Sequence, residues 1–310
     1  MKAGIKVFAP ASVANVACGF DVLGFALEKP GDEIIARFSD RAGLRISHIT
    51  GARGKLPFEV EQNTAGFAAQ RLLEHLGETG RGIEIEIHKK MPFGSGLGSS
   101  AASAVAGVMA INELLQRPLE KRDLLHFAVL GEQLADGAYH ADNVAPSLIG
   151  GMILIRNNTA LDVHRLPVPK GLYATVIYPH VRILTKDARA VLSDQVTLKQ
   201  CIEQNGNLGG LIIGLYNGDL ELISRSLNDV IIEPQRAQLI PHFYAVKEAA
   251  LSTGALGCSI SGAGPSIFAL SANSLIAENV GIAMQRIFAD AKIENELFIS
   301  PINQEGAIKC

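Results

Sequence analysis

Met91-Pro92-Phe93-Gly94-Ser95-Gly96-Leu97-Gly98-Ser99-Ser100-Ala101-Ala102 is the stretch that decides the fold of this chain. It follows a strand-like alternation of isoleucine and polar residues over 83–90 and precedes a helix-like run that begins near Ser99. Glycines at every second position let the backbone curl tightly and bring successive N–H groups towards one anion. The small residues after them open a helix, and a helix N-terminus favours negative charge. The stretch therefore predicts a phosphate-binding loop between a strand and a helix.

Two known classes of glycine-rich loop do not fit this spacing. A P-loop requires a lysine directly before its serine or threonine, and no lysine follows Gly98. The dinucleotide-binding pattern G-x-G-x-x-A is met over 96–101, but it also needs a second strand that ends in an acidic residue roughly 20 residues later. The sequence continues instead as helix through Leu115 and, after Pro118, as a second helical run. A glycine turn without a ligand remains an alternative, which the double serine and the alanine-rich helix start disfavour.

Composition predicts a globular enzyme of the cytoplasm. The 310 residues suffice for one large domain or two interlocked ones, and 48% are hydrophobic and 19% charged. The net charge of −3 and the lack of a long lysine/arginine run argue against nucleic-acid binding. We expect neither a signal peptide nor a membrane span, because the apolar run 149–155 stops at Arg156 and the N-terminus lacks a continuous apolar stretch. Four scattered cysteines favour reduced thiols over disulfides or a zinc site.

Three blocks of the sequence resemble the motifs of the GHMP kinases, the superfamily named after galactokinase, homoserine kinase, mevalonate kinase and phosphomevalonate kinase. Residues 92–102 match the family pattern P-x-x-x-G-L-G-S-S-A-A throughout. Residues 7–24, VFAPASVANVACGFDVLG, resemble the opening block of the homoserine kinase branch, and residues 254–266, GALGCSISGAGPS, resemble the third family motif. Because the blocks occur in the expected order and span almost the whole chain, the sequence is identified as a member of this superfamily.

Strand and helix patterns are mixed along the chain without repeats, which predicts an α+β fold. Strands are expected at 83–90, 150–156, 172–178, 258–260 and 266–270. Helices are expected at 99–115, from Leu124 up to Gly137, and at 195–216, 236–252 (with a break at Pro241) and 279–289. The resemblance implies two parts: an N-terminal phosphate-loop domain, 1–167, that binds ATP, and a C-terminal sheet-plus-helices domain, 168–310.

The resemblance implies phosphoryl transfer from ATP with Mg²⁺, a chemistry that depends on positioning and charge neutralisation. The nucleotide contacts it implies are the loop residues Pro92, Phe93, Gly94, Ser95, Gly96, Leu97, Gly98, Ser99, Ser100, Ala101 and Ala102. Ser100 and Glu132 match the family's metal-binding serine and glutamate, and hard oxygen ligands suit Mg²⁺. Two alternatives stay open: Ser99 in place of Ser100, and Glu132 as a solvated surface carboxylate. Asn63 resembles an asparagine that the family places near the adenine, or it is a plain helix cap.

The resemblance to the homoserine kinase branch implies an amino-acid substrate, L-homoserine, phosphorylated on its side-chain hydroxyl in threonine biosynthesis. An ammonium group needs an anionic partner, and a carboxylate suits bidentate guanidinium groups. Asp21 is expected to bind the ammonium, and Arg189 and Arg236 to bind the carboxylate. The residues that match this substrate pocket are Asn15, Asp21, His140, Thr185, Arg189, Arg236 and Gly262. Each taken alone has a structural explanation, but one substrate clamp explains all of them.

The proton acceptor of the reaction is the least defined part of this hypothesis. Asn143 is expected to orient the substrate hydroxyl, with proton loss following phosphoryl transfer, which a loose transition state tolerates. Asp142 is the alternative, as a general base. The chain has no G-x-S-x-G elbow of a Ser-His-Asp hydrolase.

Two other functions stay open at this point. The first is a GHMP kinase that acts on mevalonate or a sugar, which leaves the combination of Asp21, Arg189 and Arg236 unexplained. The second is a non-catalytic ATP-binding sensor, which is disfavoured because Glu132 and the loop serines are all retained. The sequence does not determine the oligomeric state, and it is compatible with a homodimer.

Overall fold

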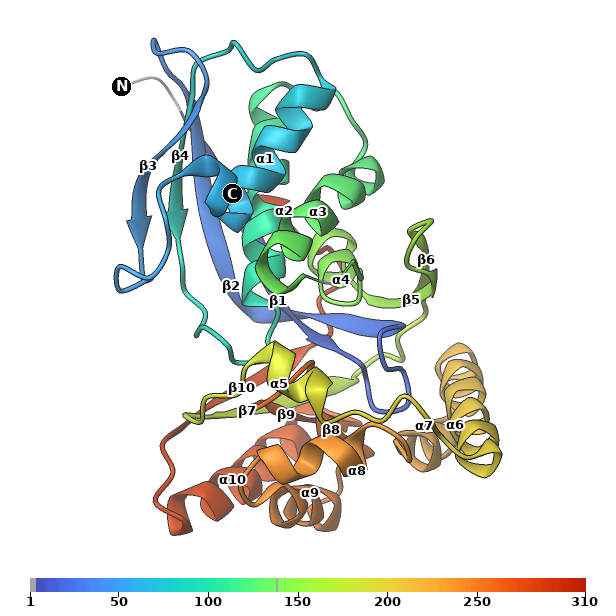
Figure 1. Ribbon diagram of the computed structural model, residues 1–310. Coiled ribbons are helices and arrows are strands. Elements are labelled where there is room, and N and C mark those ends of the chain that lie inside the picture. Colours follow the sequence, from blue (N-terminus) through green and yellow to red (C-terminus); the bar gives the residue numbers. More distant parts are fainter. Residues whose placement is uncertain (1–3, 138) are drawn as a thin grey trace.

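Two β-sheets organise the chain in the computed structural model, which describes residues 4–137 and 139–310 (Figure 1). The larger sheet has the strand order β11 (Ile308–Lys309), β1 (Ile5–Ala14), β2 (Leu23–Phe38), β4 (Ile83–His88), β3 (Leu44–Thr50). The start of β2 also pairs with β5 (Met152–Asn157), which pairs with β6 (Asp162–Leu166). β3 and β4 run parallel, and the other pairs of this sheet are antiparallel.

Four helices cover one face of the larger sheet (Figure 1): α1 (Thr64–His75), α2 (Ser99–Leu114), α3 (Leu125–Asp136) and α4 (Val144–Ile149). α2 is the central one and is buried almost along its whole length, which its run of alanine, serine and glycine permits because small residues allow neighbours to approach closely. The three isoleucines of β4, at 83, 85 and 87, are fully buried, as their alternation predicted. Each buried side chain of this size contributes about 1.5–3 kcal/mol relative to an exposed one.

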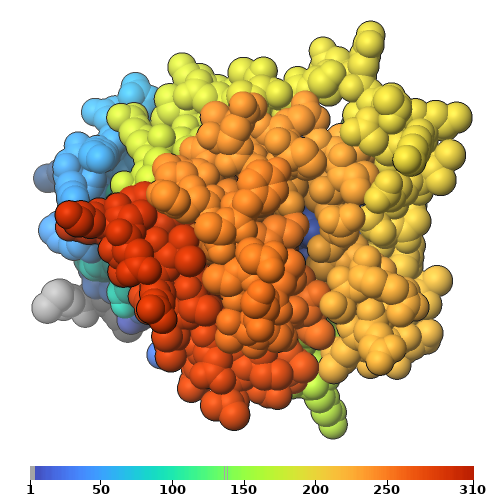
Figure 2. All heavy atoms as spheres, turned by 90° about the horizontal axis from the view of Figure 1, so that it is seen from below, coloured from blue at the N-terminus to red at the C-terminus, as the bar shows by residue number. Residues whose placement is uncertain are grey.

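The smaller sheet has four antiparallel strands, in the order β10 (Asn295–Pro301), β7 (Tyr173–Pro179), β9 (Ile267–Ser271), β8 (Gly257–Ile260). Its outer face is covered by α9 (Phe243–Ser252) and α10 (Ser274–Asp290), the orange and red segments of Figure 2. Beside them lie α6 (Leu198–Asn217), α7 (Leu220–Ser226) and α8 (Glu233–Arg236), and α5 (Thr185–Ala190) lies between the two sheets in Figure 1. Phe243, Val246 and Phe288 belong to the buried core of this half.

The predicted strands and helices are present, with small shifts of their ends, and the fold is α+β as expected. The predicted break at Pro241 is confirmed, because a short 3-10 turn ends at Leu239 and α9 begins only at Phe243. α3 ends at Gly137, whose φ of 80° is the left-handed conformation typical of a helix C-terminus. All four cysteines lie within the described residues and are free thiols.

The chain crosses between the two sheets twice. It leaves the larger sheet after β6 and enters the smaller one at β7, and at its end β11 returns to pair with Val7 and Phe8 of β1. The division into 1–167 and 168–310 stays a prediction. Among the described residues, no helix combines the length and the apolar character that crossing a membrane requires.

Candidate functional site

The glycine loop lies between β4 and α2, as predicted from the sequence. The φ angles of Gly94, Gly96 and Gly98 are 62°, 79° and 65°, all in the left-handed region that favours glycine. Gly98 is the residue directly before the first turn of α2. The backbone therefore curls at every second residue and delivers the loop to the start of a helix.

Neighbouring segments hold this loop from two sides. The backbone N–H of Ser12 in β1 donates to Leu97 O at 3.1 Å. On the other side, the turn between β8 and β9 contributes the hydroxyl of Ser261, which donates to Gly96 O at 2.6 Å. All three blocks that carry the family resemblance thus meet at one place, although they are separated by some 70 to 150 residues in the sequence.

One cavity of about 340 Å³ brings most of the predicted site residues together. It is lined by the loop, the turn after β1, α3 and the segment that follows it, α5, α8 and the turn between β8 and β9. The predicted residues that do not line it are Pro92, Leu97, Ala101 and Ala102. Leu97 and the two alanines are fully buried in the hydrophobic core instead, so their side chains support the loop from behind.

The two loop serines point in different directions. The hydroxyl of Ser100 donates to Glu132 Oε1 at 2.9 Å, whereas the hydroxyl of Ser99 accepts from Lys89 Nζ at 2.7 Å. Glu132 comes from α3 and is only 4% exposed, so it is not a solvated surface carboxylate. The geometry therefore separates the two serines that sequence reasoning treated as alternatives, and it places a carboxylate and a hydroxyl side by side in the cavity.

A buried ion pair at the base of the loop was not predicted. Lys89 pairs with Asp32 of β2, and its ammonium also donates to Ser99 O at 2.8 Å and to the hydroxyl of Ser103 at 2.8 Å. Asp32 in turn accepts the backbone N–H of Lys90 at 2.8 Å. Burial lowers the pKa of Lys89, and the charge of Asp32 opposes that shift. The pair therefore fixes the end of β4 to the first turn of α2.

The same cavity is lined by two arginines. Arg189 makes a bidentate ion pair with Asp21, with N···O distances of 3.1 and 3.2 Å. Arg236 is only 3% exposed, and its guanidinium donates to the backbone oxygens of Ala188 and Gly262 at 2.9 and 3.0 Å. Burial, and secondly the charge of Arg189, lower the pKa of Arg236 to about 10, so it stays cationic at neutral pH.

Phe20 packs against both arginines. It was not assigned a role from the sequence. Its ring centroid lies 4.9 Å from the guanidinium carbon of Arg236 and 5.7 Å from that of Arg189. A cation over an aromatic face at such distances is stabilised by about 0.5–2 kcal/mol. The ring thereby helps to keep two like charges next to each other.

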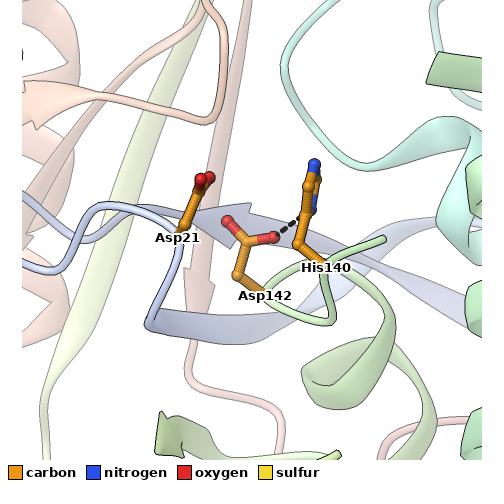
Figure 3. A group of neighbouring side chains, drawn as sticks. All are labelled: Asp21, His140 and Asp142. Carbon is orange, nitrogen blue, oxygen red and sulfur yellow. Dashed lines mark hydrogen bonds and ion pairs between the residues drawn. The ribbon is translucent and has the colours of Figure 1, made fainter. Parts of the chain in front are cut away.

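An anionic group lies next to the arginines. Asp21, His140 and Asp142 each offer a ligand atom within 4.8 Å of the others, and His140 Nδ1 lies 2.8 Å from Asp142 Oδ1 (Figure 3). Asn15 orients Asp21, because Asn15 Oδ1 accepts the backbone N–H of Asp21 at 3.1 Å and Nδ2 donates to Gly262 O at 2.7 Å.

Backbone strain accompanies this arrangement. Asn15, Val16, Ala17 and Asp21 all have positive φ, between 33° and 75°, which costs energy in residues with a side chain. The turn after β1 is therefore held in a rare conformation by its surroundings.

The remaining predicted residues also line the cavity. Asn143 precedes α4, and its Oδ1 accepts from the hydroxyl of Ser12 at 2.9 Å. Thr185 is the first residue of α5, and Gly262 belongs to the turn between β8 and β9. Asn63 lines the cavity and also caps α1, since its Oδ1 accepts from the backbone N–H groups of Ala65 and Gly66.

Comparison with known proteins agrees with this geometry. The family model described as GHMP kinases N terminal domain matches residues 63–151, and that described as GHMP kinases C terminal matches residues 211–290. A homoserine kinase of Chlorobium phaeovibrioides is 48% identical, with 98% of each chain covered. A crystal structure of homoserine kinase from Cytophaga hutchinsonii has 56% identity and a TM-score of 0.97, covering 100% of this chain and 98% of the other.

More distant structures share the fold alone. A mevalonate kinase from L. major, solved in complex with R-mevalonate, has a TM-score of 0.72 at 20% identity and covers 96% of each chain. The full-length similarity to homoserine kinases is far higher than that. The chain therefore belongs to the homoserine kinase family of the GHMP kinases.

Proposed function

We propose that this protein transfers the γ-phosphoryl group of ATP to the side-chain hydroxyl of L-homoserine, forming O-phospho-L-homoserine. The observation that carries the proposal is a single cavity that is lined by two chemically different groups of residues. A glycine loop at a helix start suits phosphates, and the arginines beside Asp21 suit an amino acid. A phosphoryl donor and a zwitterionic acceptor can thus occupy the same cavity.

The loop end has the groups that a nucleotide and Mg²⁺ require. The loop combines left-handed glycines with the start of α2, and both features favour backbone N–H groups that converge on an anion. Ser100 and Glu132 supply a hydroxyl and a carboxylate oxygen 2.9 Å apart, which fits the hard oxygen ligands that Mg²⁺ prefers. We assign the metal to these two residues, and the bound ion supplies charge neutralisation at the transferred phosphoryl group.

The ion pair between Arg189 and Asp21 suggests how the amino acid enters. Homoserine carries an ammonium and a carboxylate, so it can exchange partners with this pair: its ammonium takes Asp21, and its carboxylate takes Arg189 and the nearby Arg236. Asp21 and Arg189 each keep an opposite charge throughout, which avoids the cost of leaving either ion unpaired. The anionic group of Asp21, His140 and Asp142 then serves an ammonium, since two neighbouring guanidinium groups disfavour a divalent metal there.

Asn143 is assigned to orient the substrate hydroxyl. Asp142 is only 2% exposed, and its Oδ1 is engaged by His140, so we assign it to hold that imidazole rather than to remove the proton. The substrate hydroxyl then loses its proton after phosphoryl transfer. A loose transition state allows this order because it requires little activation of the nucleophile.

The substrate assignment is tested by a coupled ADP-release assay with ATP and Mg²⁺ on homoserine, mevalonate and galactose. We expect kcat/KM to be highest for homoserine, with the other two near background. Efficient turnover of mevalonate or galactose would favour a different GHMP kinase. No turnover of any of them by a protein that binds ATP would favour the non-catalytic sensor.

Gly98→Ala is expected to weaken ATP binding and to lower kcat with homoserine. An added Cβ would lie 2.3 Å from Ser12 Oγ and 2.7 Å from Asn143 Oδ1, so it displaces the acceptor side as well as the loop. Gly94→Ala is the matched control, because its φ is also left-handed but the nearest atom is Ile183 O at 4.0 Å. We expect kcat to fall about 10-fold further in Gly98→Ala than in the control, since small misplacements of reacting groups are costly.

Titration calorimetry with ATP and steady-state kinetics on both glycine variants measure these effects. Equal losses at the two positions would mean that left-handed strain alone accounts for them, and would contradict contact between the loop and the acceptor side.

A further inference from the structure

Ser12 lies behind the cavity, between the phosphate loop and the group that is assigned to orient the substrate hydroxyl. It belongs to β1, is 0% exposed and does not line the cavity. Its hydroxyl donates to Asn143 Oδ1 at 2.9 Å. We infer that Ser12 is a positioning residue of the reaction: it fixes the amide of Asn143 so that Nδ2, and not Oδ1, faces the substrate hydroxyl. The inference rests on the proposed function and deepens it.

The direction of this hydrogen bond determines what Asn143 can do. An asparagine amide has an acceptor oxygen and a donor nitrogen of nearly the same shape, so neighbouring groups decide which one faces a ligand. A buried hydroxyl proton needs an acceptor, and in the described part of the chain Asn143 Oδ1 supplies it. With Oδ1 engaged behind the cavity, Nδ2 is left to donate to the oxygen of the substrate hydroxyl. Such a donor aligns the nucleophile but cannot remove its proton.

Ser12 also connects the acceptor side to the loop. Its backbone N–H donates to Leu97 O at 3.1 Å, and Gly98 packs so closely that a Cβ there would lie 2.3 Å from Ser12 Oγ. One residue therefore contacts both the segment assigned to the phosphates and the amide assigned to the nucleophile. The separation between donor and acceptor is set through this residue, and misplacement by about 1 Å can cost on the order of 100-fold in rate.

A buried serine of α4, the helix that follows Asn143, provides a matched control. Ser147 of α4 is also 0% exposed, and its hydroxyl donates to Pro10 O of β1 at 2.7 Å. Ser147→Ala thus removes one buried side-chain hydrogen bond to β1 and leaves the side chain of Asn143 unchanged. Ser12→Cys is a second variant of similar shape, because a thiol is a weaker donor.

The test measures kcat and both KM values in Ser12→Ala, Ser12→Cys and Ser147→Ala, alone and in an Asn143→Ala background. We expect kcat to fall about 10- to 100-fold in Ser12→Ala and less in Ser12→Cys, with KM for ATP within about threefold of the parent value and Ser147→Ala close to the parent. In the Asn143→Ala background, Ser12→Ala should cause no further loss of kcat. If Ser12 acts through Asn143, its substitution has no effect once the amide of Asn143 is absent.

Two results would overturn the role of Ser12 while leaving the proposed function intact. One is an equal loss of kcat in Ser12→Ala and Ser147→Ala, which would indicate ordinary destabilisation. The other is an undiminished effect of Ser12→Ala in the Asn143→Ala background. A parent protein that does not phosphorylate homoserine would overturn the proposed function itself, and this role of Ser12 with it.

Discussion

Glu132→Gln is expected to lower kcat about 100- to 1,000-fold while the fold remains intact, because removal of a metal ligand at the transferred phosphoryl group costs several kcal/mol of transition-state stabilisation. The substitution keeps the volume of the side chain and removes the charge that lies 2.9 Å from the hydroxyl of Ser100. Steady-state kinetics over a range of Mg²⁺ concentrations measure the effect, and the deficit should be largest at low Mg²⁺.

Glu113→Gln is the control for the glutamate prediction. Glu113 is also buried and lies on α2, but it pairs with Arg117 and does not line the cavity. We expect its kcat to remain close to that of the parent. A folded Glu132→Gln protein with parental turnover at limiting Mg²⁺ would show that the metal is held elsewhere.

Asp21→Asn and Arg236→Leu are each expected to lower kcat/KM for homoserine about 30- to 5,000-fold, because removing one partner of a buried charge pair costs roughly 2–5 kcal/mol. KM for ATP should change little, since both residues are assigned to the amino acid and not to the phosphates. Arg286→Leu, which removes a positive charge from a side chain of α10 that is 82% exposed, is the control and should behave like the parent. Comparable losses for homoserine and ATP would contradict a dedicated amino-acid end.

The parts of the fold that were predictable are those with a strong local signal. The glycine loop, the alternating isoleucines of β4 and the alanine-rich start of α2 lie next to one another in the sequence, so each limits the interpretation of its neighbours. β2 was not predicted, because Lys29-Pro30-Gly31-Asp32 in its middle has the composition of a turn. Pairing with β1, β4 and β5 keeps this segment in the sheet.

The residue types of the candidate site could be predicted from the sequence, but the contacts between these residues could not. Asp21, Arg189 and Arg236 were grouped from the sequence, but the ion pair of Asp21 with Arg189 and the packing of Phe20 against both arginines depend on contacts across some 170 to 215 residues. The ion pair between Lys89 and Asp32 was not predictable either. Nothing in the sequence around this lysine indicates whether its ammonium contacts a buried carboxylate or solvent. Only the tertiary structure brings such groups together.

The most direct test of the amino-acid assignment compares homoserine with 4-hydroxybutanoate, which is the same molecule without its amino group. If Asp21 binds the substrate ammonium, the analogue lacks the cation that replaces Arg189 as the partner of this half-buried carboxylate. We therefore expect its kcat/KM to be at least about 30-fold lower in the ADP-release assay with the parent protein. Phosphorylation of 4-hydroxybutanoate as efficiently as homoserine would contradict recognition of the amino group and, with it, the assignment of the cavity to an amino acid.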